Sequence, residues 1–208
     1  TGDWGAPHWT NETPRQLVYD FVQEHIYCVE ATAHQIWVGT TRGGITGRVF
    51  SDNTVSWSQM TEHDKLGARY VKTFAQDGAG NIWIGTADGA YMVDAETQTL
   101  RQLPQMIRLT SGQIKDVLLH GNYAYVATFG GGLNIYDMQT YQWTAVTKMD
   151  GAGSDFLTAL AEHQGMLWLG SFGGGVTRYN PRNQTMRVYT RKQGLLSNAI
   201  HDVASFDR

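Results

Sequence analysis

Polar residues stand in this chain at positions where a buried strand would normally carry apolar ones. The chain has five short segments that begin with an apolar residue, at positions 26, 71, 114, 157 and 200. The polar residues that follow these positions are Lys72, Lys115, Asp116, His201 and Asp202. Polar groups that converge around a concavity are the usual means of binding a small polar ligand. These five residues are therefore the first candidates for a ligand site.

Four more candidates come from loops that we expect to lie beside those segments. Two are charged, Arg42 and Asp88, and two are aromatic, Phe129 and Phe172. The phenylalanines could contact a ligand, or they could fill the space between neighbouring structural units. For the whole set, the alternative is a water-filled channel that holds no specific ligand.

Catalytic and metal-binding chemistry has less support than ligand binding. The seven histidines lack metal-ligand spacing, so we predict no metal site and no cofactor. No Ser-His-Asp arrangement with a nucleophile elbow is present, so we predict no catalytic residues. Paired carboxylates for glycoside cleavage stay an alternative, because spacing in sequence does not fix spacing in space. The acids near one expected face are Asp64, Asp150, Asp155 and Asp202, and a charged loop rim is the simpler interpretation.

A recurrent aromatic signature shows what must position these residues. It is centred on Trp37, Trp83, Tyr125 and Trp168, at intervals of 46, 42 and 43 residues. A period of roughly 40 to 45 residues built from strands is typical of propellers and solenoids. Each unit is a small sheet that must stack on its neighbours to bury its apolar face. We expect the signature tryptophans to pack between units, with stacking on sugar rings as the alternative.

Turn residues divide each unit into four strands. Glycine and asparagine at 77–81, 87–89 and 130–132 supply the positive φ angles that hairpins need. The glycine runs precede strands, so they are predicted turns and not phosphate-binding loops, which must open a helix. Four strands in a meander form one propeller blade.

Three histidines, His34, His120 and His163, fall in the turns between the first and second strands, at the rim opposite the expected ligand site. We expect them to face solvent.

We therefore predict an all-β fold, a β-propeller with four complete four-stranded blades and a partial blade at each end. The complete blades are expected at about residues 26–60, 70–104, 114–147 and 157–190, and the partial blades at 1–25 and 199–208. The two partial units cannot complete one blade together, because one resembles a fourth strand and the other a first. We expect a segment of a larger propeller, completed by flanking blades or by another copy.

Composition narrows the class of partner. The formal charge is −3 and the charges are interspersed, so we predict no nucleic-acid partner. No apolar stretch approaches the length of a membrane helix, so we predict no membrane contact by this segment. Cys28 is the single cysteine and falls in an apolar strand pattern, which favours a buried, unreactive thiol.

Several segments, taken in order, resemble the two-component regulator propeller repeat. Residues 194–200 resemble its Gly-Leu-x-Ser/Asn-Asn-x-Ile segment, and residues 77–86 resemble its Asp-x-x-Gly-x-Leu-Trp-Ile-Gly-Thr strand. Residues 130–137 and 173–181 resemble the Gly-Gly-Leu-x-x-Tyr-Asp/Asn-Pro element that follows. The resemblance covers about residues 26–208. The third repeat departs from it, with Tyr125-Val126-Ala127 in place of Trp-Ile-Gly.

The resemblance implies a function in signal transduction. In that family the propeller is usually the extracytoplasmic sensor of a bacterial membrane receptor, which places this segment in the periplasm or outside the cell. The output, a histidine kinase or a cyclic-dinucleotide synthase, would lie outside this chain. We therefore predict non-enzymatic binding of a small ligand, with oligosaccharides among the candidates. The alternatives are a lyase or hydrolase that acts on polysaccharide, and a protein-docking scaffold.

Overall fold

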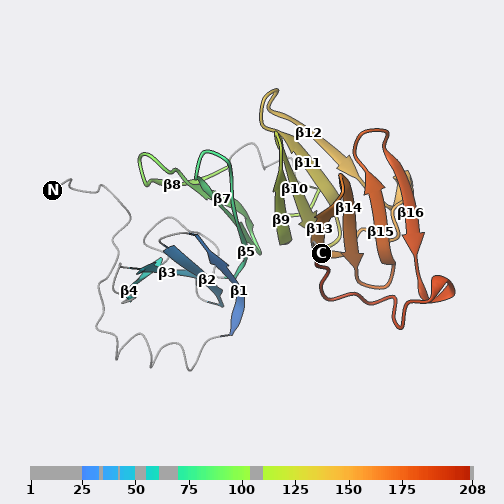
Figure 1. The fold of residues 1–208 in the computed structure, drawn as a ribbon, viewed down its shortest axis with the longest axis horizontal. Coiled ribbons are helices and arrows are strands. Elements are labelled where there is room, and N and C mark those ends of the chain that lie inside the picture. The colour runs from blue at the N-terminus through green and yellow to red at the C-terminus, as the bar shows by residue number, and fades with distance from the viewer. Residues whose placement is uncertain are drawn as a thin grey trace. The chain divides into compact units, whose positions relative to one another are not determined.

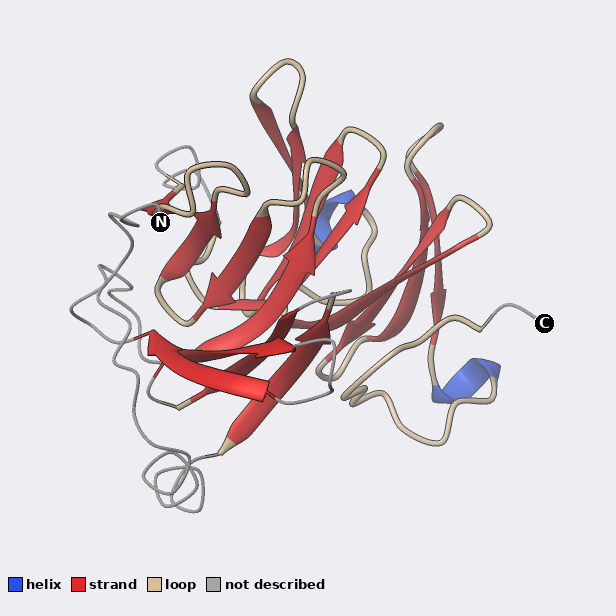
Figure 2. Ribbon diagram, turned by 60° about the vertical axis from the view of Figure 1, so that its left-hand side comes forward, coloured by secondary structure: helices blue, strands red, loops and turns tan. Residues whose placement is uncertain are grey.

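The described chain is built from four antiparallel sheets of four strands each (Figure 1). The computed structural model describes residues 25–32, 35–41, 43–49, 55–60, 70–103 and 110–206. Strands dominate these ranges, with two short 3₁₀ turns at Lys148–Asp150 and Arg191–Gln193 (Figure 2). The prediction of an all-β propeller with four complete four-stranded blades is confirmed.

In each sheet the strands follow one another in chain order, as in a propeller blade. The first sheet holds β1 (Ile26–Ala31), β2 (Gln35–Thr40), β3 (Gly43–Val49) and β4 (Val55–Met60), and the second holds β5 (Val71–Gln76), β6 (Ile82–Thr86), β7 (Gly89–Val93) and β8 (Leu100–Gln102). The third holds β9 (Ile114–His120), β10 (Tyr123–Thr128), β11 (Gly132–Asp137) and β12 (Gln142–Val146), and the fourth holds β13 (Leu157–His163), β14 (Met166–Ser171), β15 (Gly175–Asn180) and β16 (Thr185–Tyr189).

The chain divides into two compact units, each containing two sheets. The first unit covers residues 1–104 and the second covers residues 105–208. In the first unit, Trp37 packs with Phe74, Ile84 and Tyr91 in an apolar core, and the Trp37 and Phe74 ring centroids lie 5.7 Å apart. Cys28 packs against this core and is half-buried. The expected packing of Trp37 between blades is therefore observed.

The core of the second unit lies between the third and fourth sheets. Tyr125 and Leu133 of the third sheet pack with Leu160, Leu169 and Tyr179 of the fourth. The middle strands of the sheets supply most of these residues, because side chains on both of their faces are covered. The outer strands β12 and β16 keep exposed polar residues.

Glycine loops join neighbouring blades of the second unit through the backbone. The N–H groups of Gly130 and Gly132 both donate to the carbonyl of Asp155, at 3.0 and 2.9 Å. One repeat later, Gly173 and Gly175 donate in the same way to the carbonyl of Asn198, at 3.0 and 2.9 Å. The glycine runs are turns, as predicted, and they also hold the loop that enters the next blade.

Residues 199–203, where we expected a first strand, are not paired in a sheet, and the partial blade at that end stays a prediction. Residues 199–206 contain no strand. In the complete blades a first strand is paired to the second strand of its own blade, and the described residues supply no such partner after residue 200. Ile200 still docks on the fourth sheet, since its N–H donates to Ser171 and its carbonyl accepts from the Thr158 hydroxyl. The partial blade expected at 1–25 lies outside the described residues except for His25.

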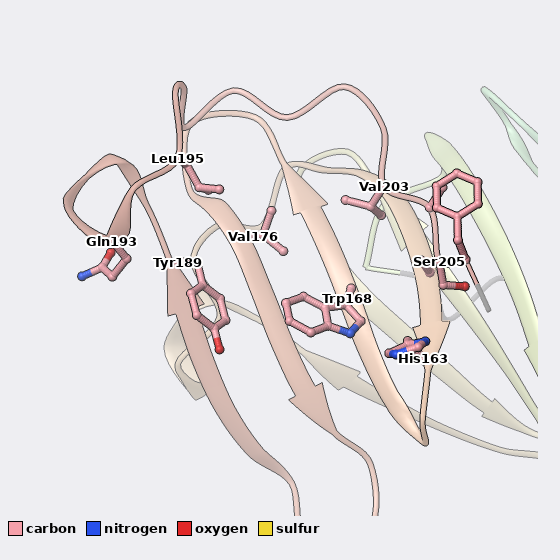
Figure 3. A pocket seen from close by; sticks show the side chains of 11 residues that line it. His163, Trp168, Val176, Tyr189, Gln193, Leu195, Val203 and Ser205 are labelled. Carbon is pink, nitrogen blue, oxygen red and sulfur yellow. The ribbon is translucent and has the colours of Figure 1, made fainter. Parts of the chain in front are cut away.

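The C-terminal segment covers part of an apolar cavity of about 490 Å³ on the fourth sheet (Figure 3). Trp168 and Val176 of the sheet face this cavity, and Leu195 and Val203 close it from the segment. His163, expected in solvent, is half-buried at its edge. Trp168 thus lines this cavity, whereas Tyr125, at the same position of the third sheet, is only 3% exposed.

Substitution of Gly175 by alanine should destabilise the fold far more than the same change at Gly165. Both glycines have positive φ, 75° and 76°, but a Cβ at Gly175 would collide with the Tyr189 carbonyl, whereas the space around Gly165 is open. We expect Gly165→Ala to cost about 1 kcal/mol of unfolding free energy and Gly175→Ala about 3 kcal/mol. Urea unfolding followed by tryptophan fluorescence measures both, and equal costs would contradict the steric argument.

Candidate functional site

Three phenylalanines meet on the surface of the second unit and form what we call the phenylalanine cluster: Phe129, Phe156 and Phe172. Phe129 follows β10, Phe172 follows β14, and Phe156 directly precedes β13. The Phe129 ring centroid lies 5.0 Å from that of Phe156, edge to face, and 6.4 Å from that of Phe172. Phe156 is 46% exposed and Phe172 is 57% exposed. The cluster therefore presents aromatic surface to solvent at the end of the strands.

A lysine adds a positive charge to this cluster. The Lys115 Nζ atom lies 4.8 Å from the Phe129 ring centroid, within the range of a cation–π contact. Lys115, Phe129 and Phe172, which come from three separate segments of the sequence, were all predicted as site residues, and the structure brings them together. A cation beside exposed rings can bind a ligand that has both an apolar face and polar groups.

The backbone around the cluster is fixed by hydrogen bonds. Phe129 pairs with Phe156 through an isolated antiparallel bridge, and the Phe172 N–H donates to the Phe156 carbonyl at 2.8 Å. Ser111 and Ser154 hydroxyls donate to the carbonyls of Phe129 and Phe172. The rings thus project from loops that are held in place before any ligand arrives.

Asp116, another predicted site residue, has a structural role. Its Oδ1 accepts from the Val117 N–H at 2.8 Å, and its Oδ2 accepts from the Leu160 N–H of the next blade at 2.7 Å. The carboxylate therefore connects β9 to β13. Asp202 occupies the same position two repeats later, where its Oδ1 accepts from Val203, and both Asp202 and His201 are exposed.

The acids considered for glycoside cleavage also serve the loops. Asp150 accepts from the N–H and hydroxyl of Thr147, and these bonds hold the pKa of Asp150 below its ordinary value. Asp155 Oδ1 accepts from the Lys148 N–H at 2.6 Å. Asp64 lies outside the described residues. Two of the four acids are thus engaged in ordering the loop that enters the fourth blade.

The remaining predicted residues belong to the first unit. Lys72 places its Nζ 2.9 Å from the Tyr27 ring centroid and 5.3 Å from that of Tyr70. Burial lowers the pKa of Lys72, and the Cys28 thiol opposes that shift. Asp88 is exposed on the turn between β6 and β7, and Arg42 lies outside the described residues. Each unit thus contains a lysine–aromatic group of its own.

Sequence reasoning missed Phe156, Tyr27 and Tyr70 as site residues. Phe156 and Tyr70 share one repeat position, directly before the first strand of a blade, and both are about half exposed. An alignment of the repeats would have shown an aromatic residue at this position in two blades. Within the described ranges, no three histidine, cysteine, aspartate or glutamate side chains gather closely enough to hold a metal ion. The same residues include no helix long and apolar enough to cross a membrane.

Comparison with protein families supports the resemblance found in the sequence. The model of the two component regulator propeller matches residues 65–88, and that of the LVIVD repeat matches residues 111–138. Histidine kinase P4 of Formosa agariphila is 25% identical over 212 residues, which cover 95% of this chain and 15% of the kinase. Residues 65–88 are therefore similar to the two-component regulator propeller repeat.

Solved structures show the same fold. The extracellular domain assigned to a hybrid two component system of B. thetaiotaomicron superposes with a TM-score of 0.71 at 21% identity, over 83% of this chain and 24% of that one. A second such domain from the same organism gives a TM-score of 0.68 at 15% identity, over 79% and 25%. This chain spans a quarter or less of the length of these relatives.

Replacing Asp116 by alanine should destabilise the second unit, whereas Asp202→Ala should not. Both aspartates accept a bond from the following N–H, but Asp116 alone also accepts from the next blade, at Leu160. We expect Asp116→Ala to lower the unfolding free energy by about 2 kcal/mol and Asp202→Ala by less than about 0.5 kcal/mol. Urea denaturation compares them, and equal small losses would show that the bond between blades adds nothing.

Proposed function

We propose that this chain is a ligand-sensing segment of the extracytoplasmic propeller of a bacterial signal-transduction receptor, and that the phenylalanine cluster with Lys115 contacts the ligand. The observation that carries the proposal is the group of partly exposed rings with a lysine ammonium 4.8 Å from one of them. The sequence and structural similarity to a histidine kinase and to extracellular domains of two-component systems supports the sensing role.

The exposed rings are the part of this surface that gains most from being covered. Water contact with apolar area is unfavourable by roughly 25 cal/mol per Å². Phe156 and Phe172 keep about half of their surface in water although they sit on well-ordered loops. A ligand with a ring-shaped apolar face would cover them, while its polar groups reach the Lys115 ammonium. Oligosaccharides have this combination and are the probe that we propose.

A similar lysine–aromatic group in the first unit supports the same role. Lys72 stands at the repeat position of Lys115 and lies against the exposed rings of Tyr27 and Tyr70. Repetition of a cation beside an aromatic ring at one strand position is unusual for packing alone, because packing would favour an apolar side chain there. Both lysines are therefore proposed as ligand contacts.

Sensing is proposed without catalysis. Asp150 and Asp155, two of the acids that a glycosidase would need, already accept loop hydrogen bonds. The family model that matches residues 65–88 describes a regulator propeller. Incubation with an oligosaccharide library separates the functions, because a sensor raises the melting temperature without shortening the sugar chains. Chain scission seen by chromatography would establish the polysaccharide-cleaving alternative instead.

Removing the exposed rings should weaken binding without unfolding the protein. For an oligosaccharide that stabilises the chain, we expect Phe156→Ala with Phe172→Ala to weaken affinity at least tenfold, about 1.4 kcal/mol. The melting temperature should change little, because both rings are half exposed. Phe206→Ala is the matched control, since Phe206 is 82% exposed and lies outside the cluster. Calorimetric titration measures both affinities. Equal affinity in the double variant and the control would show that the phenylalanine cluster does not contact the ligand.

The two lysines give a separate test of the proposal. The Lys72→Ala, Lys115→Ala double variant should bind the same oligosaccharide more weakly, because each ammonium stands beside an aromatic ring, Tyr27 or Phe129. Its melting temperature should stay nearly unchanged, since neither lysine is fully buried. Titration of the double variant against the parent chain measures the effect. Unchanged affinity, or a ligand located on the outer strands, would contradict the proposed role of the lysines.

A further inference from the structure

A cavity of about 580 Å³ opens in the second unit at the other end of the strands from the phenylalanine cluster. Tyr123, at the start of β10, lines this cavity, whereas Phe129 follows the end of the same strand. The turn residues of the third and fourth blades form its rim, and the apolar side chains of Ile135 and Leu167 form part of its wall. Its volume is in the range of small-molecule sites.

Two buried tyrosines leave their hydroxyl groups without a protein partner in this cavity. Tyr125 and Tyr179 are each only 3% exposed and both line it. Within the part of the chain that the structure describes, neither hydroxyl makes a hydrogen bond to protein. Neither hydroxyl oxygen is sealed from solvent, so a ligand in the cavity can reach both of them. Burial, with Tyr179 and Tyr123 nearby, raises the pKa of Tyr125 to about 12, which keeps its hydroxyl protonated.

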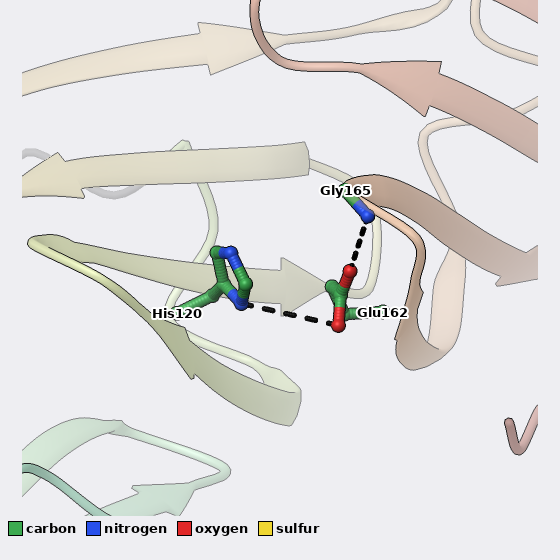
Figure 4. Close-up of polar contacts among 3 residues, drawn as sticks. All are labelled: His120, Glu162 and Gly165. Atoms are coloured by element: carbon green, nitrogen blue, oxygen red, sulfur yellow. Dashed lines mark hydrogen bonds and ion pairs between the residues drawn. The ribbon is translucent and has the colours of Figure 1, made fainter. Parts of the chain in front are cut away.

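With the imidazole of His120 counted as neutral, the lining of the cavity carries two carboxylates and one guanidinium. Asp137 accepts from the N–H groups of Gln139 and Thr140, and these bonds hold the pKa of Asp137 below its ordinary value. Glu162 accepts from the Gly165 N–H at 2.5 Å, and its other oxygen lies 3.9 Å from His120 Nδ1 (Figure 4). Neutral N–H donors leave the charge of both carboxylates in place. On the basic side the lining holds His120, which is 55% exposed, and the exposed Arg182.

We propose that this cavity binds the ammonium group of a small organic amine. An ammonium carries three N–H donors, which match the oxygens of Tyr125 and Tyr179 and the Glu162 carboxylate. Tyrosine rings also attract a cation through their faces. A carboxylate or phosphate ligand would face two carboxylates, and a neutral polyol would leave the excess negative charge unmatched. The site is distinct from the phenylalanine cluster in position and in ligand chemistry.

The test compares an amine with its neutral counterpart on the 208-residue chain. The probes are 2-phenylethylamine, 2-phenylethanol, which has a hydroxyl in place of the ammonium, and glucose as a polyol. Calorimetric titration should show that the amine binds with a dissociation constant on the order of 1 mM, as expected for a ligand of this size. The alcohol and glucose should bind at least tenfold more weakly. Equal or tighter binding of either neutral probe would overturn the proposal.

Variants locate the amine and separate binding from folding. Tyr125→Phe and Tyr179→Phe remove hydroxyls that contact no described protein group, so each should weaken the amine about fivefold at an unchanged melting temperature. Glu162→Gln should weaken it at least tenfold, because the charge is lost while the side-chain shape is kept. Tyr189→Phe is the matched control, since Tyr189 lines the other cavity, and it should bind like the parent chain.

The phenylalanine cluster must also be excluded as the amine site, because aromatic rings attract cations. The Phe156→Ala, Phe172→Ala variant should bind 2-phenylethylamine with the affinity of the parent chain. Loss of amine binding in that variant, or full affinity in both tyrosine variants, would overturn the assignment. A failure of the oligosaccharide experiment would leave this result unaffected, because the two sites lie at opposite ends of β10.

Discussion

The packing of the loops in the second unit depends on two backbone carbonyls, those of Asp155 and Asn198. Each accepts two glycine N–H groups from the loop of the preceding blade. The side chain of the same residue accepts a further N–H, from Lys148 in one repeat and from Arg191 in the next. One residue therefore orders the loop between blades through its side chain and binds the neighbouring glycine loop through its carbonyl. Because the role needs only acceptor oxygens, aspartate and asparagine serve it equally well.

This interaction explains why each glycine run of the second unit is followed, before the next repeat begins, by an aspartate or asparagine, Asp155 or Asn198. The two outer glycines of each run need positive φ to direct both N–H groups to one carbonyl, and Gly132 has φ of 73°. The middle residue has no room for a side chain, since a Cβ at Gly131 would collide with Thr110. Phe129 and Phe172 stand immediately before these runs, so the interaction that joins the blades also fixes the rings of the phenylalanine cluster.

The sequence predicted what depends on local pattern. The 42 to 46 residue intervals and the turn glycines were enough for the blades, and they placed Phe129, Phe172 and Lys115 at one end of the strands. It could not reveal that Asp116 accepts from Leu160, 44 residues away, because that bond depends on how two blades stack. For the same reason His120 was expected to face only solvent, although its imidazole lies 3.9 Å from Glu162 of the next blade.

The third blade departs from the tryptophan signature of the other blades, and the departure changes the hydrogen bonding at that position. Trp83, in the second blade, donates its indole N–H to Asp77, so that signature residue has a partner within its own blade. The third blade carries Tyr125 there, and the smaller ring leaves a hydroxyl that no described group binds, in a cavity lined by Tyr179 of the next blade. The Tyr125 hydroxyl opens to this cavity, whereas the indole N–H of Trp37, at the same position of the first blade, is buried without a partner among the described residues. Functional residues are expected at positions where the sequence departs from the repeat pattern and no contact within the protein compensates for the departure. The exchange of tryptophan for tyrosine thus supplies the proposed amine site with an oxygen that a ligand can reach.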